Sequence, residues 1–205
     1  MRKIIFLIIT ILYSLSVGAQ FEWTPAKVIF NDGSSSRGFV KFPKHSGGLI
    51  SIGSTKIKFR KKRKSTTEKF GNESVEEVVF GDEEFTTAHF KYVPIKKNKY
   101  VLMELIIEGK VNLFKRTVLK STSTPSTNPV IPQNVTYYDD TQFFLFRNDG
   151  EKAKLIAGPN SIGLFSAKAQ KYFDDCPKIL EYIEAGLYNI EDLVQLVKDY
   201  NLLCD

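Results

Sequence analysis

Short runs of alternating apolar and polar residues, separated by turn-forming residues, fill the chain from position 21 to about position 120. Alternation with a period of two is typical of β-strands that bury one face. The intervals between the runs are too short to hold the helical crossovers that parallel strands require. The pattern therefore predicts an α+β protein with a mainly antiparallel sheet, arranged as a sandwich or as a partly open barrel.

Two local features refine this prediction. Asn31-Asp32-Gly33 separates two alternating runs and indicates a β-hairpin. Residues 100–107 are almost continuously apolar, as expected for a central strand buried on both faces. Aromatic residues, which favour strands, make up 13% of the chain. The predicted strands are 26–30, 37–42, 49–52, 55–60, 75–80, 85–92, 100–107, 110–116, 142–147 and 152–156.

A Pro/Ser/Thr-rich stretch, residues 121–134, interrupts the strand pattern and contains three prolines. It has too few apolar side chains to offset the entropy lost on ordering, so we predict a mobile loop. Because two more strands follow, this loop is expected to be an excursion within one β-rich domain that spans residues 20–158.

The remaining residues, 159–205, predict a short cap of three helices. Ser166 is placed to cap the first helix, and Pro177 lies in the first turn of the second, where its missing N–H is tolerated. Asn189 is expected to cap the third helix. Apolar residues recur there at helical spacing, at Ile190, Leu193, Val194, Val197 and Tyr200.

The N-terminal residues 1–19 resemble a secretory signal peptide. Two basic residues precede an apolar run at positions 4–12, and Val17 and Ala19 occupy the positions that a signal peptidase recognises. An uncleaved anchor is the alternative, but a membrane span needs about 20 apolar residues. We therefore predict cleavage after Ala19 and a periplasmic or extracellular location, with no transmembrane span in the mature chain.

Removal of Arg2 and Lys3 with the signal peptide would lower the net charge from +6 to +4. A mildly basic charge by itself indicates no particular partner.

Hydrophobic residues make up 42% of the sequence, which is enough for a substantial core.

The chain has two cysteines, Cys176 and Cys204, both in the predicted cap. In an exported protein an even pair favours a disulfide bond, which would join the start of the second helix to the end of the third. Closing a loop of this length stabilises a fold by about 3–4 kcal/mol. Two separate buried thiols are the alternative; a zinc site is not expected, since the histidines lie far away in sequence.

A basic stretch is the most conspicuous candidate site. Its residues are Lys56, Lys58, Arg60, Lys61, Lys62, Arg63 and Lys64. One interpretation is a patch that binds an envelope protein, an anionic glycan or a lipid headgroup; nucleic acid is not expected for an exported chain. The alternative is a solvated strand that protects a sheet edge. In that case the acidic residues that follow, between Glu73 and Glu84, would neutralise the stretch across neighbouring strands.

No motif for catalysis, metal binding or cofactor binding stands out. The Asn-Asp-Gly segments lack the glutamate of a calcium loop, and the adjacent Asp139 and Asp140 would point to opposite faces of a strand. Neither His45 nor His89 has an obvious partner, and no Gly-x-Ser-x-Gly or phosphate loop occurs. We therefore predict no cofactor and no metal, and the chain is not expected to be an enzyme.

The signal ending in Ala19-Gln20, the turn-rich strands and two further segments together resemble uncharacterised exported proteins of the Gram-negative envelope, which have a β-rich body and a helical tail. These segments are Glu108-Gly109-Lys110-Val111-Asn112-Leu113-Phe114 and the pattern Asp175-Cys176-Pro177…Tyr200-Asn201…Cys204. The resemblance implies an envelope location and supports the pairing of the cysteines. It implies no activity and no catalytic residues.

Three functional hypotheses follow. The first is a non-catalytic binding or interaction module that uses the basic stretch together with exposed aromatic residues at Tyr137-Tyr138 and Phe143-Phe144. The second is a β-barrel carrier whose aromatic interior holds a small apolar ligand. The third, less favoured, is a hydrolase with an active site assembled from distant residues.

Overall fold

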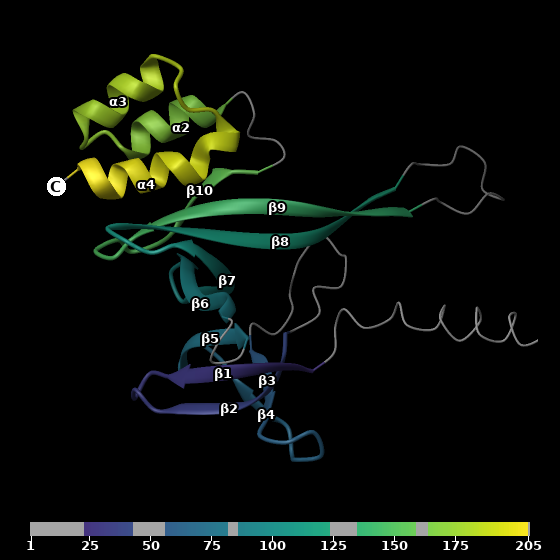
Figure 1. Ribbon diagram of the computed structural model, residues 1–205. Coiled ribbons are helices and arrows are strands. Elements are labelled where there is room, and N and C mark those ends of the chain that lie inside the picture. Colours follow the sequence, from purple (N-terminus) through teal and green to yellow (C-terminus); the bar gives the residue numbers. More distant parts are fainter. Residues whose placement is uncertain (1–22, 43–55, 82–85, 124–134, 159–163, 205) are drawn as a thin grey trace, which may run out of the picture.

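The computed structural model describes residues 23–42, 56–81, 86–123, 135–158 and 164–204. Within these ranges the chain forms ten β-strands in one sheet, followed by three α-helices (Figure 1). The predicted α+β class, with an antiparallel sheet and a C-terminal helical cap, is confirmed. Residues 1–22, which include the predicted signal peptide, lie outside the described residues.

Every strand pairing is antiparallel, and the order is β10-β9-β8-β7-β6-β5-β1-β2-β3-β4. The outermost strands, β10 and β4, are not neighbours, so the sheet is open. The strands are β1 (Thr24–Phe30), β2 (Ser35–Lys41), β3 (Ile57–Arg60), β4 (Glu68–Phe70), β5 (Val75–Gly81), β6 (Thr86–Lys96), β7 (Lys99–Ile107), β8 (Val111–Ser123), β9 (Val135–Arg147) and β10 (Lys154–Ala157).

The predicted hairpin is the β1–β2 connection. Phe30 and Ser34 are joined through their backbones at 2.9 Å, and Gly33 has a φ of 81°, a left-handed conformation that glycine adopts without a steric penalty. Other parts of the strand prediction differ from the structure. The strand β4 was missed because three residues are too few to show alternation, and the predicted strand 49–52 lies outside the described residues.

The predicted loop 121–134 is wrong at its start, because β8 continues to Ser123. Ser123 pairs there with Val135. The predicted strand 142–147 therefore covers only the second part of β9, and the first part was missed. Backbone pairing with β9 holds this polar end of β8 extended, although its sequence has little apolar mass. Figure 1 shows β8 and β9 as a long ribbon that extends beyond β7 and β10. Residues 124–134 lie outside the described residues.

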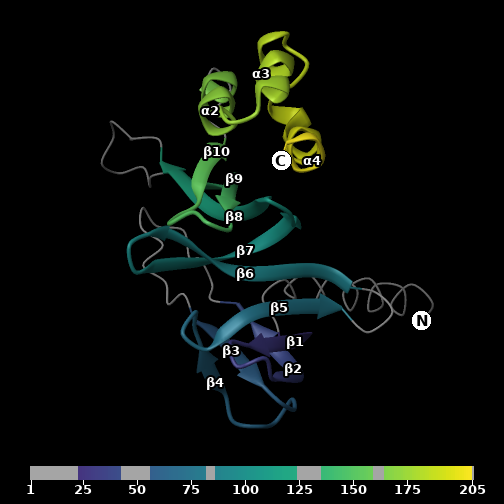
Figure 2. The ribbon, with the colours of Figure 1, turned by 90° about the vertical axis from the view of Figure 1, so that its left-hand side faces the viewer.

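The middle of the sheet has apolar contacts on both of its faces. Val101 and Met103 of β7 pack against Phe114 and Phe144 of β8 and β9, whereas Leu102 packs on the other side against the core of β1–β5. The prediction of a doubly buried strand at 100–107 is thus confirmed for the face of Val101 and Met103 only, because the opposite face is partly exposed. Figures 1 and 2 show the resulting layers: the helices lie over β8–β10, β6 and β7 come next, and β1–β5 form the far end.

The cap consists of α2 (Phe165–Tyr172), α3 (Pro177–Glu184), the short 3-10 turn η4 (Ile190–Asp192) and α4 (Leu193–Leu203). The predicted cap at Ser166 is wrong, because α2 already begins at Phe165. Pro177 does begin α3, and the Asn189 side chain accepts a hydrogen bond from Glu191 N at 2.7 Å. Asn189 and Asp192 together form a capping box ahead of α4.

The cap packs its apolar residues onto the side of β8 and β9 that carries Leu113 and Leu145. Leu193, Leu196, Val197 and Tyr200 of α4 are buried in the same cluster as Leu113 and Leu145 of the sheet. Val194, predicted on this apolar face, is instead 37% exposed. The predicted disulfide between Cys176 and Cys204 is present and joins the start of α3 to the end of α4.

Arg147, to which the sequence analysis gave no role, links the sheet to the cap. Its guanidinium donates two hydrogen bonds to the Asp175 carboxylate, at 2.7 and 2.9 Å, and one to the Tyr200 hydroxyl at 2.8 Å. It also lies 5.2 Å from the ring centroids of both Tyr172 and Tyr200. Hydrogen bonding from Arg147 lowers the pKa of Asp175 to about 2.

A second contact fixes α4 against the turn between β7 and β8. The Asn201 amide accepts a hydrogen bond from Val111 N at 2.8 Å and donates one to Val111 O at 2.9 Å. The approach is so close that a Cβ on Gly109 would lie 2.4 Å from Asn201 Nδ2. Glycine at this position therefore permits the docking of the cap.

We expect Gly109→Ala to destabilise the protein by about 1–3 kcal/mol, the usual cost of overpacking. Asn201→Ala should cost a similar amount, because it leaves the N–H and C=O of Val111 without their partner. The double variant should be no less stable than Asn201→Ala alone, since the clash has then disappeared. Urea unfolding of the three variants measures this; simple additivity would contradict the proposed clash.

The Arg147–Asp175 contact also predicts a pH dependence. The folded-state pKa of Asp175 is about 2, below its ordinary value of 3.8, so its contribution to stability is present above pH 4. That contribution is lost as the pH falls from about 4 to about 2. Asp175→Asn should therefore lower the melting temperature at pH 6 but hardly at pH 2. Asp174→Asn is the matched control, and an equal loss at both pH values for Asp175→Asn would contradict the prediction.

Candidate anion-binding surface

The basic stretch forms β3 and the turn that follows it. Ile57 and Phe59 are buried, whereas Lys58 and Arg60 alternate with them and point away from the core, as the sequence predicts. The exposed residues Lys61–Lys64 occupy the β3–β4 turn. This turn is held by Ser65, whose N–H donates to Lys62 O at 3.0 Å and whose hydroxyl accepts from Lys62 N at 3.0 Å.

The strand register brings further cations onto the same side of the sheet. Lys58 lies directly opposite Lys41 of β2 on one side and Lys69 of β4 on the other. Lys27 of β1 lies directly opposite Arg37 of β2. Directly opposed residues of an antiparallel pair share one face. The surface formed by Lys27, Arg37, Lys41, Lys58, Arg60 and Lys69 is called the basic face below, and Lys61–Lys64 the basic loop.

Like charges placed directly opposite each other destabilise a sheet. The basic face has two such sets, the pair Lys27–Arg37 and the row Lys41–Lys58–Lys69. No Asp or Glu alternates onto this face in the described strands β1–β4. The register thus places like charges opposite each other on this face, an arrangement that by itself disfavours strand pairing.

The two arginines of the basic stretch lie against aromatic rings. The Arg60 guanidinium lies 4.1 Å from the Trp23 ring centroid, and its Nε donates to Thr67 Oγ1 at 2.7 Å. The Arg63 guanidinium lies 5.8 Å from the Phe39 ring centroid. Such cation–π contacts orient the guanidinium groups. The lysines of the basic loop extend from the turn as exposed ammonium groups.

The expected neutralisation by the acidic stretch occurs at one described contact, the ion pair between Lys56 and Glu73, which lowers the pKa of Glu73. Glu77 instead contacts His89, a histidine for which the sequence indicated no partner. Residues 82–84 of the acidic stretch lie outside the described residues. Elsewhere in the sheet cations do pair with carboxylates, as in Lys91–Glu108 and Lys115–Glu104, at 2.8 and 2.7 Å.

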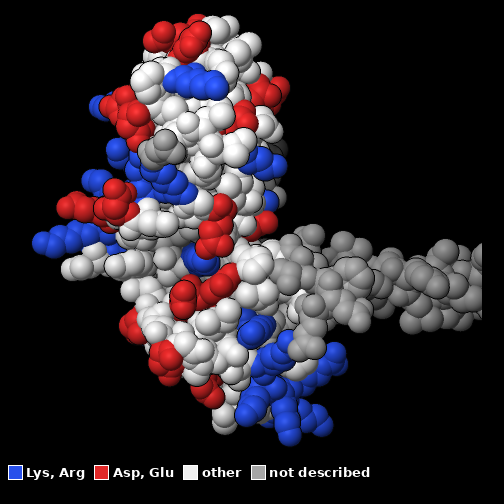
Figure 3. Space-filling view, turned by 60° about the vertical axis from the view of Figure 1, so that its left-hand side comes forward, with Lys and Arg blue, Asp and Glu red and all other residues white. Residues whose placement is uncertain are grey.

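This difference is visible on the molecular surface. Figure 3 shows Lys and Arg side chains gathered at the end of the molecule built from β1–β4, whereas acidic and basic side chains are mixed over its middle and over the cap. The charge of the protein is therefore segregated, although its net charge is only moderately positive.

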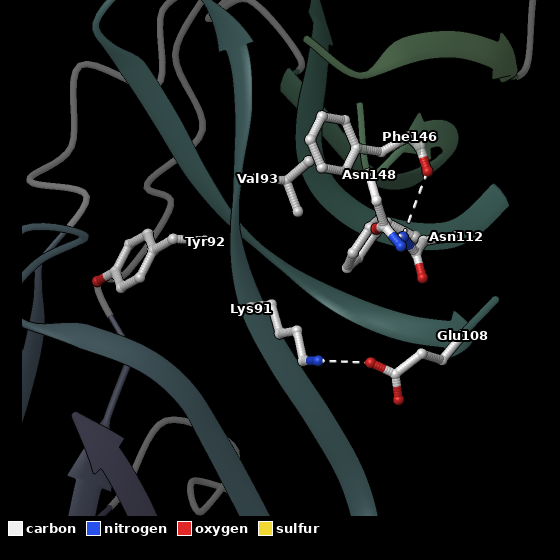
Figure 4. A pocket seen from close by; sticks show the side chains of 8 residues that line it. Lys91, Tyr92, Val93, Glu108, Asn112, Phe146 and Asn148 are labelled. Carbon is white, nitrogen blue, oxygen red and sulfur yellow. Dashed lines mark hydrogen bonds and ion pairs between the residues drawn. The ribbon is translucent and has the colours of Figure 1, made fainter. Parts of the chain in front are cut away.

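A small pocket lies elsewhere, between β6 and the ends of β7, β8 and β9. It has a volume of about 130 Å³ and is lined by Lys91, Tyr92, Val93, Glu108, Asn112, Phe114, Phe146 and Asn148 (Figure 4). Its polar groups satisfy one another, since Lys91 pairs with Glu108 and Asn112 Nδ2 donates to Asn148 Oδ1 at 2.7 Å. Ligand pockets usually measure about 300–1,000 Å³, so this hollow gives the carrier hypothesis no support.

The aromatic residues proposed for binding are not assembled into a surface. Phe144 is 8% exposed because it lies inside the sheet, between Phe114 of β8 and Leu155 of β10, and Phe143 packs against the cap core. Their prediction as exposed residues is therefore wrong. The side chains of Tyr137 and Tyr138 lie outside the described residues. Trp23 and Phe39, which the sequence analysis did not single out, are the aromatic residues that accompany the basic stretch.

Comparison with protein-family models, with curated proteins and with solved structures finds no match to this chain. The resemblance to exported envelope proteins thus stays a prediction. Among the described residues, no helix has the length and apolar character needed to cross a membrane. The same residues contain no group of three His, Cys, Asp or Glu side chains placed to hold a metal ion.

The opposed lysines predict an unusual effect of mutation. Lys58→Glu should raise the free energy of unfolding by about 0.5–1 kcal/mol at low salt, because it converts two repulsions into two attractions. Lys58→Gln should have about half this effect, and 1 M salt should reduce both, since it screens exposed charges. Urea unfolding at the two salt concentrations measures this. Destabilisation by both substitutions at low salt would contradict the register-based explanation.

Proposed function

We propose that this protein is an exported, non-catalytic binding module that engages a polyanionic partner through the basic face and the basic loop. The observation that carries the proposal is the row Lys41–Lys58–Lys69 with the opposed pair Lys27–Arg37 beside it. A polyanion placed on this surface would offset the repulsion between these cations. The unfavourable arrangement in the free protein would then become a favourable one in the complex.

Protection of a sheet edge is the competing explanation, and it accounts for only part of the basic face. Lys69 lies on the edge strand β4, where lysine discourages the pairing of sheets with one another. Lys27 and Lys41 belong to β1 and β2, which are interior strands with partners on both sides. A binding role explains the edge and the interior cations together, and we therefore favour it.

The chemistry of the cations indicates how the partner would be recognised. Lysine ammonium groups act as point charges, whereas arginine recognises carboxylates and phosphates through a rigid bidentate fork. Lys58, Lys69 and the lysines of the basic loop are exposed, while Arg60 and Arg63 are oriented by Trp23 and Phe39. We therefore expect recognition of charge density over an extended surface, with a steep dependence on ionic strength.

Export is supported by the signal-peptide pattern of residues 1–19 and by the presence of a disulfide bond between Cys176 and Cys204. Disulfides persist in oxidising compartments such as the periplasm and the extracellular space. The partner would accordingly be an anionic component of the envelope, either a polymer or a surface.

Retention on a dextran sulfate resin tests the proposal. We expect the protein to elute at a markedly higher salt concentration than the triple variant Lys61→Ser, Lys62→Ser, Lys64→Ser. The matched control is Lys96→Ser, Lys97→Ser, Lys99→Ser, which removes the same charge from exposed lysines of the β6–β7 turn. Three strands, β5, β1 and β2, separate β6 from β3 in the sheet.

The control variant should elute close to the unmodified protein, because its lysines lie outside the proposed surface. Equal shifts for the two triple variants would mean that net charge alone governs retention. That result, or no retention of the unmodified protein, would overturn the proposed function.

A further inference from the structure

The shape of the basic face restricts the kind of polyanion that fits it. Neighbouring strands lie about 4.8 Å apart, so the row Lys41–Lys58–Lys69 extends about 10 Å across the sheet. The pair Lys27–Arg37 lies further along the same face, and the basic loop continues from the end of β3. These cations form a two-dimensional array, which complements a plane of charge better than a single line of charge.

A site for one small anion would need donors that converge on a point. Here the cations stand on one side of a sheet at successive cross-strand positions, so their charges are spread over a surface and do not surround one point. The described pocket is lined by none of them and lies over β6 and β7 instead. The geometry thus favours an extended anionic surface over a small ligand.

The position of Trp23 adds an independent indication. This residue, the single tryptophan of the chain, directly precedes β1 and lies against Arg60 of the basic face. Tryptophan is enriched at the boundary between lipid and water, where its amphipathic ring matches the headgroup region. A half-buried tryptophan beside an arginine is suited to an anionic headgroup layer.

The sequence also brings this surface near a membrane during export. Residues 13–22 separate the apolar run at 4–12 from Trp23. A segment of that length reaches at most about 35 Å even when fully extended. Until the predicted cleavage after Ala19, an apolar run held in a bilayer would therefore keep the basic face within reach of the lipid headgroups.

We infer that the polyanionic partner is the headgroup surface of an anionic lipid bilayer, which the basic face and basic loop contact peripherally. This inference rests on the function proposed above and names the class of its partner. Lysines near an anionic bilayer act almost independently and each adds a similar increment to binding. An acidic polysaccharide, which would contact the same cations along a line, is the outcome that the test must separate.

The test uses vesicles of phosphatidylcholine alone and vesicles that also contain phosphatidylglycerol, with the processed protein purified after export. Sedimentation measures total binding. The emission of Trp23 reports on the basic face itself, since the chain has no other tryptophan. We expect binding to the anionic vesicles only, with a shift of Trp23 emission to shorter wavelength and weaker quenching by acrylamide.

The triple variant of the basic loop should lose at least about tenfold in affinity for the anionic vesicles. The control variant of Lys96, Lys97 and Lys99 should stay within about twofold of the unmodified protein. Binding to dextran sulfate without binding to vesicles would overturn the lipid inference and leave the proposed function standing. Failure to bind either probe would overturn both, and vesicle binding without a change in Trp23 emission would show that another face is used.

Discussion

The short ladder between β7 and β8 is the constraint on which the rest of the structure depends. Only three residue pairs join these strands, Glu104–Lys115, Leu105–Phe114 and Ile107–Leu113, and the register shifts within them. Both strands continue well beyond the ladder with other partners. The two parts of the sheet can therefore diverge, and β6 and β7 pack one face against β8 and β9 and the other against β1–β5. Different parts of one continuous sheet thereby pack against one another as layers.

This arrangement gives the two ends of the molecule different properties. At one end the cap seals the far side of β8 and β9, held by Arg147 with Asp175, by Asn201 with Val111, and by the disulfide (Figure 1). At the other end β1–β4 bury one face in an apolar core, and the residues of the basic face on the opposite side are partly or fully exposed in the described part of the chain. In the middle Lys91 and Lys115 pair with carboxylates, whereas in β1–β4 like charges lie directly opposite one another.

The sequence predicted those features that depend on local patterns. Alternation of Ile57 and Phe59 with Lys58 and Arg60 identified the outward side of β3, and an Asp-Gly pair located the β1–β2 hairpin. The cysteine pairing followed from their number and the expected compartment. These inferences need only neighbouring residues or a simple count, and the structure agrees with them.

Features that depend on long-range register were not predictable in the same way. Lys41 and Lys58 face each other only because β3 pairs with β2, and Lys69 lies on a strand of three residues with no recognisable pattern. Asn201 meets Val111 across 90 residues of sequence. The basic stretch was visible as a run of charge, but its extension into a basic face required the strand order. Arg147 carried no sequence signal at all.

Lysine footprinting tests the central claim, that the opposed cations of β1–β4 form the binding surface, most directly. Acetylation of the folded protein, read by mass spectrometry, would compare the reactivity of each lysine with and without bound polyanion. The account predicts selective protection of Lys58, Lys61, Lys62, Lys64 and Lys69, while Lys96, Lys97 and Lys99 keep their reactivity. Uniform protection of all these lysines, or protection of the β6–β7 turn alone, would contradict it.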